Sequence, residues 1–351
     1  MSTGKVMTIE RLLNNLDQIP SATMWLLSDI SEYRGMQKMF TRQIPQKLKS
    51  LKEFAIIESV VSSNRMEGLI IDHKRIKPVI LGESALKDRD EEEIRGYRKA
   101  LSWIHKDSEN LSVSEGTLKD FHKTCRGEIW DSGKYKERDG DIIETYPDGK
   151  SRVRFITASA AKTPELMSNL ITAWDLLKTD RNIHPLIGIS LFNLDFLCIH
   201  PFRDGNGRVS RLFLLLQAYH FGYEVGRYIS LERVIEENKE RYYETLELSS
   251  IGWHEGTNNP WPFINYMLFI IKSAYKEFEN RASHMGPERG EKTKIIKDTI
   301  EKFYGNFTVN EIRINCPGVS IDLIRKVLKD MSKDRIITST GRGRGASWRK
   351  V

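Results

Sequence analysis

Twelve consecutive residues constrain this chain more than any other part of it. The stretch His200-Pro-Phe-Arg-Asp-Gly-Asn-Gly-Arg-Val-Ser-Arg211 lies between two apolar runs, residues 186–199 and 212–219. Both runs are long enough and apolar enough to predict buried helices. Core packing alone does not call for a polar loop between two such helices that combines two glycines, a histidine, an acid, an amide and arginines. The stretch therefore predicts a functional site carried by a helical hairpin.

The second half of this loop has the chemistry of an anion site. Gly205-Asn206-Gly207 can turn sharply and present successive backbone N–H groups. The helix that follows adds the partial positive charge of its N-terminus, which suits a phosphate. Arg208 and Arg211 add two guanidinium groups in the first turn. We therefore expect a phosphate-bearing ligand here.

The first half of the loop adds a metal ligand and a base. Asp204 is an acid among arginines, and Mg²⁺ prefers one or two carboxylates together with substrate phosphates. His200 precedes the loop, and an imidazole that titrates near neutrality suits a general base. The combination predicts a nucleotide–Mg²⁺ site. A buried histidine at a helix end before an arginine-rich helix start is the plainer interpretation, but it explains neither the glycines nor the acid.

This stretch resembles the signature of the Fic (filamentation-induced-by-cAMP) family, His-x-Phe-x-(Asp/Glu)-Gly-Asn-Gly-Arg-x-x-Arg. All eight fixed positions match, namely His200, Phe202, Asp204, Gly205, Asn206, Gly207, Arg208 and Arg211. The resemblance implies a protein adenylyltransferase, in which a Ser, Thr or Tyr hydroxyl of a target protein attacks the α-phosphate of ATP. It also makes self-modification and a homodimer expectations for this chain.

The same resemblance assigns roles to the residues of the loop. His200 would deprotonate the target hydroxyl, and Asp204 would hold Mg²⁺. Asn206 and the glycine backbone would hold the α-phosphate, while Arg208 and Arg211 would bind the outer phosphates.

A second motif lies upstream, at the end of a helix expected over residues 48–67. Gly68 suits the position after a helix C-terminus, and Glu67 lies where the helix dipole disfavours a carboxylate. Ser63-x-x-x-Glu67-Gly68 resembles the inhibitory motif of Fic proteins, (Ser/Thr)-x-x-x-Glu-(Gly/Asn). The resemblance implies that Glu67 pairs with Arg211 and takes the space of the ATP γ-phosphate. The plainer interpretation is a solvated Glu67 beside Arg65.

The remaining N-terminal sequence predicts supporting helices. Residues 1–50 carry helical patterns interrupted by prolines and predict an accessory layer. Residues 69–90 indicate a connection, and the charged run 87–93 is expected to be the solvated start of a helix over 92–105. Further helices are expected from residue 114, over 163–177, over 261–279 and, as one continuous helix, over 230–248. Tyr242 and Tyr243 in the last of these are either packing residues or contacts of the nucleotide.

One β-hairpin is expected in this helical chain. Residues 141–145 and 151–156 alternate in polarity around a Pro-Asp-Gly turn. In Fic proteins a hairpin at this position forms a flap that aligns the target segment by main-chain pairing. The family often begins this region with Gly-x-(Tyr/Phe)-Arg, whereas this chain has Gly133-Lys-Tyr-Lys136. Lysine keeps the charge without the bidentate fork, so Lys136 is left out of the expected site.

The C-terminal segment carries the whole net charge. Residues 288–351 hold 15 basic and 8 acidic side chains, a net of +7, which equals the net charge of the full chain. Three short helices followed by two strands predict a winged helix, with Arg325, Lys326 and Lys329 on the third helix. Binding to DNA or another acidic surface and a basic packing module are both compatible with this pattern.

Taken together, the patterns predict a mainly α-helical fold with four regions. These are an N-terminal helical region with the inhibitory helix (1–110), a Fic core with a hairpin flap (111–280), a linker (281–291) and a winged helix (292–351).

The cellular setting follows from weaker signals. The three cysteines, Cys125, Cys198 and Cys316, are isolated and odd in number, which favours a reducing compartment and no metal cluster. We find no signal-peptide pattern and no apolar stretch long enough to cross a bilayer. A cytoplasmic protein without a membrane partner is expected.

Two other functions fit the same residues. The site could use another nucleotide donor or remove AMP from modified proteins, with Glu67 orienting a water. The chain could instead be a DNA-binding regulator whose site only senses nucleotide, in which case DNA binding would depend on salt.

Overall fold

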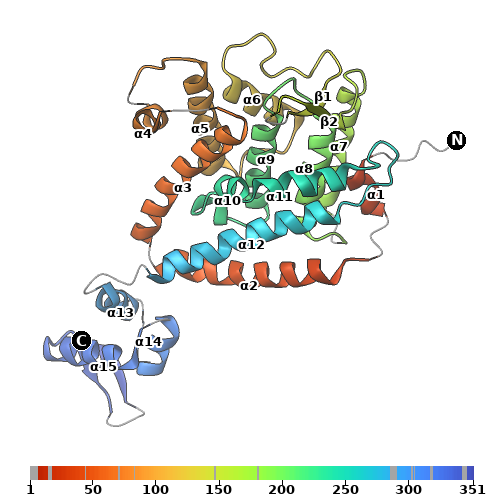
Figure 1. Ribbon diagram of the computed structural model, residues 1–351. Helices are drawn as coiled ribbons and strands as arrows, with labels where there is room; N and C mark the ends of the chain where they lie inside the picture. The colour runs from red at the N-terminus through yellow and green to blue at the C-terminus, as the bar shows by residue number, and fades with distance from the viewer. Residues whose placement is uncertain are drawn as a thin grey trace. The chain divides into compact units, whose positions relative to one another are not determined.

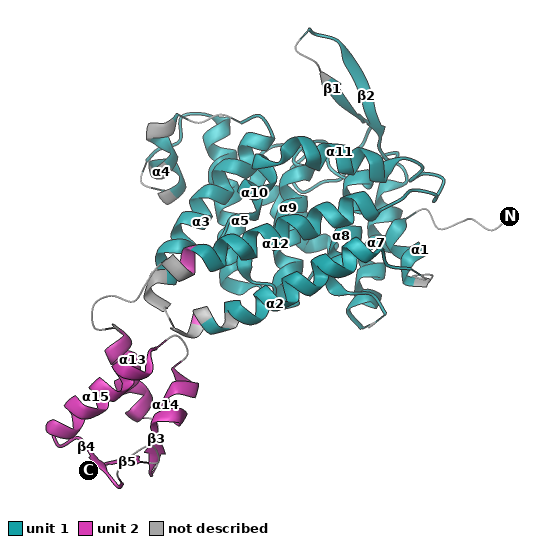
Figure 2. Cartoon of the chain, turned by 60° about the horizontal axis from the view of Figure 1, so that its bottom comes forward, with its two compact units in different colours: residues 1–39, 46–280 teal, residues 40–45, 281–351 magenta. Residues whose placement is uncertain are grey.

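The computed structural model describes residues 7–14, 18–43, 45–69, 72–82, 84–145, 148–179, 182–284, 291–301, 303, 305–316, 319–341 and 346–351. The chain divides into two compact units (Figure 2). Unit 1 contains residues 1–39 and 46–280, and unit 2 contains residues 40–45 and 281–351. The predicted boundary at residue 110 lies inside unit 1, and most of the predicted linker 281–291 lies outside the described residues.

Unit 1 is helical apart from one hairpin (Figure 1). Its first helices are α1 (Thr8–Asn14), α2 (Ser21–Gln43), α3 (Pro45–Met66), α4 (His73–Leu81), α5 (Arg89–Asp107) and α6 (Glu115–Arg126). The hairpin of β1 (Asp141–Thr145) and β2 (Ser151–Ile156) follows. The later helices are α7 (Thr163–Thr179), α8 (Pro185–Ile199), α9 (Asn206–His220), the short 3-10 helix η1 (Val225–Arg227), α10 (Leu231–Glu237), α11 (Lys239–Ser250) and α12 (Trp261–His284). The mainly helical fold with a single flap-like hairpin in this unit confirms the prediction for these residues.

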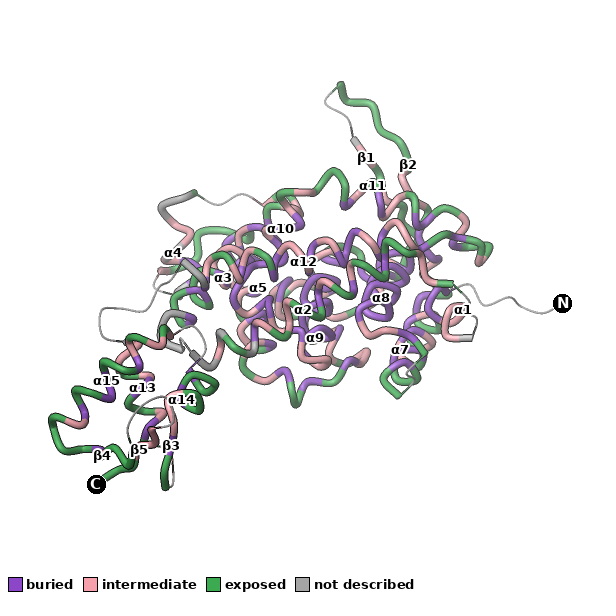
Figure 3. Tube along the Cα trace, turned by 90° about the horizontal axis from the view of Figure 1, so that it is seen from below, coloured by how far each residue is buried: buried purple, intermediate pink, exposed green. Residues whose placement is uncertain are grey.

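Helix α8 is the centre of unit 1. Every residue from Leu186 to Ile199 is buried, and α8 contacts α1, α7, α9 and α11. Figure 3 shows this helix buried along its length. An all-apolar helix can be stable in a soluble protein only when neighbours cover its whole circumference. The signature loop therefore begins at the end of the most enclosed element of the fold.

Two predicted segments are wrong in detail. The expected connection over 69–90 contains α4, which includes Pro78 and packs against α5. The expected continuous helix over 230–248 is two helices, because the chain breaks at Asn238, whose side chain donates to the carbonyl of Val234 at 2.8 Å. Asparagine competes for backbone hydrogen bonds in this way and so favours helix ends.

The predicted solvation of the charged run 87–93 is wrong for two of its residues. The run does start a helix, and Asp88 caps it by accepting from the N–H of Glu91 at 3.0 Å. However, Glu91 and Glu93 are buried rather than solvated. Glu91 pairs with Arg75 of α4, and Glu93 pairs with arginines of α6 and α9. Buried carboxylates need such partners, so charge composition alone did not reveal their position.

A buried acid attaches the N-terminal helix to the core. Asp195 of α8 accepts hydrogen bonds from the backbone N–H groups of Thr8 and Ile9, at 3.0 and 2.8 Å. It also accepts from the indole N–H of Trp253 at 2.7 Å. These donors satisfy a carboxylate that would otherwise be costly to bury, and they hold α1 against α8.

Unit 2 contains α13 (Glu291–Glu301), β3 (Phe307–Thr308), α14 (Val309–Asn315), α15 (Ile321–Lys333), β4 (Ile337–Ser339) and β5 (Ser347–Lys350). The strands form an antiparallel sheet in the order β3-β5-β4. Thr308 and Glu311 form a capping box at the start of α14. The predicted helices and terminal strands are therefore present, with β3 in addition, and the assignment as a winged helix stays a prediction.

None of the helices in the described part of the chain is both long enough and apolar enough to cross a membrane.

Candidate active site

The signature loop is built on two left-handed residues. Helix α8 ends at Ile199, and His200 caps it with φ +52° and ψ +61°. Gly205 then precedes α9 with φ +81°. Glycine takes this conformation freely, but histidine does so only where its surroundings enforce it. His200 is thus held in an uncommon conformation between two helices.

Asn206 braces the loop from within. Its amide accepts from the N–H of Phe202 at 2.9 Å and donates to the carbonyl of the same residue at 2.7 Å. The side chain is buried, so both ends of its amide are used in shaping the turn. The phosphate contact implied for Asn206 by the resemblance would therefore come from its backbone N–H, which lies in the first turn of α9.

Helix α6 holds the loop from outside. His122 stacks on Phe202 with ring centroids 4.0 Å apart, and its Nε2 lies 2.9 Å from the carbonyl oxygen of Asp204. The N–H of Gly133 donates to Nδ1 of the same ring at 2.9 Å. His122 therefore acts as a neutral imidazole that donates through Nε2. Burial lowers the pKa of His122 to about 4, which keeps it in this form.

Two of the loop's charges, Arg208 and Asp204, belong to an ion network that includes the buried Glu93. Arg208 is 1% exposed and donates to Glu93 of α5 at 2.6 Å. Arg126 of α6 bridges Glu93, at 2.8 Å, and Asp204, at 2.7 Å. Glu93 thus compensates two buried guanidinium groups at once. The network fixes Arg208 as part of the protein interior, rather than as a side chain free in solvent.

Arg211 has a different set of partners, all supplied by α3 and the turn after it. Its Nε donates to the hydroxyl of Ser63 at 2.8 Å, and its Nη2 donates to the carbonyl of Ser63 at 2.9 Å. The same Nη2 pairs with Glu67 at 2.8 Å. The two residues expected to be regulatory therefore both contact the expected phosphate ligand Arg211.

The position of Glu67 depends on a glycine. A Cβ atom on Gly207 would collide with Oε1 of Glu67 and lie 3.0 Å from Arg211. Only a residue without a side chain lets the carboxylate lie against the first turn of α9. Glu67 therefore covers the end of the helix where an anion would bind.

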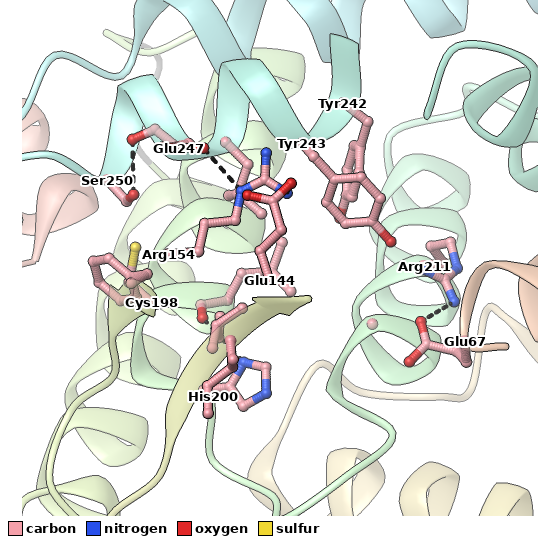
Figure 4. A pocket seen from close by; sticks show the side chains of 16 residues that line it. Glu67, Glu144, Arg154, Cys198, His200, Arg211, Tyr242, Tyr243, Glu247 and Ser250 are labelled. Atoms are coloured by element: carbon pink, nitrogen blue, oxygen red, sulfur yellow. Dashed lines mark hydrogen bonds and ion pairs between the residues drawn. The ribbon is translucent and has the colours of Figure 1, made fainter. Parts of the chain in front are cut away.

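A cavity of about 360 Å³ lies beside these residues. Glu67 and Arg211 line one end of it, and Glu247 and Ser250 line the other, with His200 along its side (Figure 4). Gly207 also lines the cavity. Tyr242 and Tyr243 and the hairpin strands complete the wall. The cavity thus brings together the hairpin, the histidine and the first turn of α9, and its volume suits a small-molecule ligand.

His200 is set up to act as a neutral base. Burial, followed by the nearby Lys136 ammonium, lowers its pKa to about 4. Glu67 and Asp204 act in the opposite direction but do not outweigh these effects. The imidazole is therefore unprotonated at neutral pH and can accept a proton.

Asp204 fits a Mg²⁺ ion only in part. Its side chain is 53% exposed, with Oδ1 accepting from the N–H of Gly205 at 2.6 Å and Oδ2 paired with Arg126. Within the described part of the chain, no cluster of three or more His, Cys, Asp and Glu side chains could hold a metal alone. The residues suit an ion that takes one protein carboxylate and completes its coordination with phosphates and water.

The sequence patterns did not indicate three residues that support the site: Glu93, Arg126 and His122. The helical period does indicate that Glu93 is buried, because it lies one turn before Tyr97 on the buried face of α5. His122 and Arg126 likewise follow Leu118 at spacings of four on α6, a buried face that all three share. Charged residues on an apolar helical face indicate buried pairs, although the partners cannot be read from the pattern.

Comparison with known sequences points to one family. The Fic/DOC family profile matches residues 112–218, which include the whole signature loop. A curated relative, the protein adenylyltransferase Fic of Nematostella vectensis, is 23% identical over 211 residues. That match covers 57% of this chain and 45% of the relative, so the chain spans less than half of the relative's length.

Solved structures have the same fold. A Fic family protein from Desulfovibrio desulfuricans has a TM-score of 0.62 at 24% identity, covering 95% of this chain and 97% of that one. A Fic domain-containing signalling protein from Bacteroides thetaiotaomicron has a TM-score of 0.61 at 21% identity, covering 75% and 97%. With the family profile matched across the signature loop, residues 112–218 of the chain form a Fic domain.

Proposed function

We propose that this protein transfers AMP from ATP to a hydroxyl side chain of a target protein, and that Glu67 represses the transfer. One observation carries the proposal: a neutral His200 and the N-terminus of α9 face a single cavity, and Glu67 covers the helix end by pairing with Arg211. The distant relative described as an adenylyltransferase supports the same reaction class.

The reaction assigns a task to each group. The target hydroxyl oxygen forms a bond to the α-phosphorus while the bond from that phosphorus to the α,β-bridging oxygen breaks and pyrophosphate leaves. His200 accepts the hydroxyl proton. The backbone N–H groups at Asn206 and Gly207 stabilise charge on the α-phosphate. Arg211 would bind an outer phosphate once its carboxylate partner is displaced.

Mg²⁺ would bind through Asp204 together with the phosphates of ATP. The ion supplies charge neutralisation at the phosphates. Because Oδ2 of Asp204 is paired with Arg126, the protein contribution is a single carboxylate whose direction is fixed by that pair. Arg208, held by Glu93, adds positive charge behind the loop.

The other end of the cavity would take the nucleoside. Glu247 and Ser250 line this end (Figure 4), and the Arg154–Glu247 ion pair at 2.9 Å provides both donors and acceptors. With the phosphates at α9, the hairpin would lie over the α-phosphate. An exposed edge of that hairpin could pair with the main chain of a target segment.

Repression follows because Glu67 and the γ-phosphate of ATP would compete for Arg211. Glu67 occupies the space next to Gly207 and neutralises Arg211. An ATP molecule with its γ-phosphate at Arg211 would meet a carboxylate at close range, which like-charge repulsion disfavours. The resting protein is therefore expected to bind ATP without transferring AMP.

The test uses the wild type, Glu67→Gly and Glu67→Gly/His200→Ala, each incubated with Mg²⁺ and α-labelled ATP, with and without cell lysate. We expect label on protein with Glu67→Gly, at least about 10²-fold above both other samples, because loss of a general base costs about 10²–10⁴-fold. Label in the lysate identifies a target, and label without lysate identifies self-modification.

Other outcomes would redirect the proposal. Equal label with the wild type and Glu67→Gly would refute repression by Glu67. No label from any protein that binds ATP would refute AMP transfer. Release of AMP from a pre-labelled protein by the wild type, but not by Glu67→Gly, would then favour the removal reaction.

A further inference from the structure

Lys136 lies beside the site without belonging to the signature loop. It follows α6 in the irregular segment before β1, at the position where the family often has arginine. The residue is 9% exposed, which is uncommon for a lysine. Its side chain and backbone both contact the chain around His200.

Two hydrogen bonds from Lys136 enclose the histidine. The ammonium group donates to the carbonyl of Ile199 at 3.0 Å, and the backbone N–H donates to the carbonyl of Pro201 at 2.8 Å. These carbonyls belong to the residues directly before and after His200. Since His200 has φ +52°, its backbone needs outside contacts to stay in that conformation. Lys136 supplies such contacts on both sides.

The same ammonium group reaches the base of the flap. It donates to the hydroxyl of Thr157 at 2.7 Å, and that hydroxyl donates to the carbonyl of Gly140 at 2.6 Å. Gly140 directly precedes β1 and Thr157 directly follows β2. One charged group therefore connects both ends of the hairpin to the turn that carries His200.

We propose that Lys136 is a positioning residue that fixes His200 in its left-handed conformation and ties that conformation to the base of the β1–β2 flap. This inference rests on the proposed role of His200 as the general base. It assigns to Lys136 a role in geometry and charge, and no contact with the nucleotide.

The charges around His200 give this proposal a distinctive readout. The Lys136 ammonium lowers the pKa of His200, whereas the carbonyl of Leu197 and the carboxylates of Glu67 and Asp204 raise it. Burial lowers the pKa of Lys136 itself to about 8, so it is mostly charged at neutral pH. Replacing Lys136 with a neutral residue should raise the pKa of His200. A lysine that only fills space would leave that pKa unchanged.

The first experiment does not depend on catalysis. Histidine labelled with ¹³C at Cε1 is titrated by NMR in the wild type, Lys136→Met and Lys136→Arg, and the His200 signal is assigned by its loss in His200→Ala. We expect the pKa of His200 to be about one unit higher in Lys136→Met than in the wild type, because removal of a nearby positive charge favours the protonated imidazole. Lys136→Arg should stay near the wild type.

The second experiment measures transfer in the Glu67→Gly background. Adding Lys136→Met should lower kcat about 10²-fold, because small displacements of a catalytic group have effects of that size. KM for ATP should change less than about twofold, since Lys136 is expected to affect the chemical step rather than binding. The acidic limb of the pH–rate profile should move up with the pKa of His200, and Lys136→Arg should restore most of the rate.

A second variant guards against a folding defect. Thr157→Val keeps the lysine charge but removes both hydrogen bonds that link Lys136 to the flap, and should lower kcat by roughly 5- to 30-fold, the effect of two lost hydrogen bonds. Unchanged His200 titration in a folded Lys136→Met protein, or an unchanged kcat in both variants, would overturn the proposal. If Glu67→Gly shows no transfer, the proposed function fails, and the NMR titration still decides the role of Lys136.

Discussion

Two arginines of α9, three residues apart, face two different regions of the molecule. Arg208 pairs with Glu93 of α5, and the two side chains are 1% and 4% exposed. Arg211 pairs with Glu67 after α3, where the carboxylate is 20% exposed. Both pairs have good geometry, with N···O distances of 2.6 and 2.8 Å. The distances are similar, but the two surroundings differ in how readily each pair can be opened.

The two pairs therefore have different roles in the fold. We call the ion network of Glu93 with Arg208 and Arg126 the frame, and we call Glu67, which lies over the first turn of α9, the cover. Glu93 serves two guanidinium groups inside the packed helices α5, α6 and α9, so its removal leaves Arg208 without its carboxylate partner and Arg126 with Asp204 alone. Glu67 lies after the last residue of α3, directly before Gly68, and Arg211 keeps two bonds to Ser63 when Glu67 leaves. Of the two similar arginines of the signature, Arg208 is thus built into the packed interior, and under the proposed function Arg211 would be the one that exchanges its carboxylate partner for a phosphate.

The largest effect is expected from breaking the frame. Glu93→Ala should lower the free energy of unfolding by about 3–5 kcal/mol, because it leaves the buried charge of Arg208 unpaired. Urea denaturation measures this change. Asp90→Ala, on the exposed start of the same helix, is the matched control and should cost less than about 1 kcal/mol through the helix dipole. A loss below 1 kcal/mol for Glu93→Ala would mean that the buried network is not the frame.

The frame was also the part that sequence reasoning could not reach. The signature loop, the hairpin and the pairing of Glu67 with Arg211 come from local patterns and from a family motif. Glu93 and Arg126 are 33 positions apart, and Arg208 lies on a third helix. Their meeting depends on how α5, α6 and α9 pack. A helical period shows which face is buried, but it does not show which charge on one helix meets which charge on another.

Local patterns also failed where a single residue overrides its neighbours. The segment 230–248 has a helical composition, yet Asn238 ends α10 and precedes α11. The segment 69–90 contains Pro78, yet α4 forms around it. Contacts such as the pair between Arg75 and Glu91 stabilise that short helix from outside. Tertiary contacts of this kind decide marginal helices, and they are absent from the sequence pattern.

Acid should lower the free energy of unfolding through His122, the α6 histidine that contacts the signature loop. Its folded-state pKa is about 4, lowered mainly by burial, whereas an unfolded histidine titrates near 6.5. Below pH 6.5 the unfolded chain takes up a proton that the folded chain does not, so stability falls with pH until about pH 4. The contribution at pH 4 reaches about 3 kcal/mol. Protonation of Nδ1 would also break the bond from Gly133.

Unfolding midpoints between pH 7 and pH 4 measure this dependence. His122→Gln keeps polar contacts with the loop but does not titrate, so its midpoint should change less with pH than that of the wild type. Equal slopes for the two proteins would show that His122 does not contribute. This result would leave the ion pairs, rather than the histidine, as the main connection between α6 and the signature loop.

Breaking the cover should cost less. Glu67→Gln keeps the shape of the side chain and removes its charge, which should lower the free energy of unfolding by about 1–2 kcal/mol, the range for a hydrogen bond to a charged group. Mg²⁺ and ATP should then raise the melting temperature of Glu67→Gln more than that of the wild type, because Arg211 is free for phosphate. A loss as large as that of Glu93→Ala would erase the distinction between frame and cover.

The smallest effect is expected two residues from Glu67. Arg65 pairs with Glu236 at 3.0 Å, but its side chain is 54% exposed. Exposed pairs contribute about 0–1 kcal/mol because water and salt screen them. Arg65→Ala should therefore change neither stability by more than that amount nor AMP transfer by more than about fivefold, the rate equivalent of 1 kcal/mol. The AMP-transfer rate of Arg65→Ala is measured beside those of the wild type and Glu67→Gly, which give the lower and upper limits of the scale. If Arg65→Ala released transfer as strongly as Glu67→Gly, the surface contact between α3 and α10 would hold Glu67 in place. The pair between Glu67 and Arg211 would then not be the contact that represses transfer.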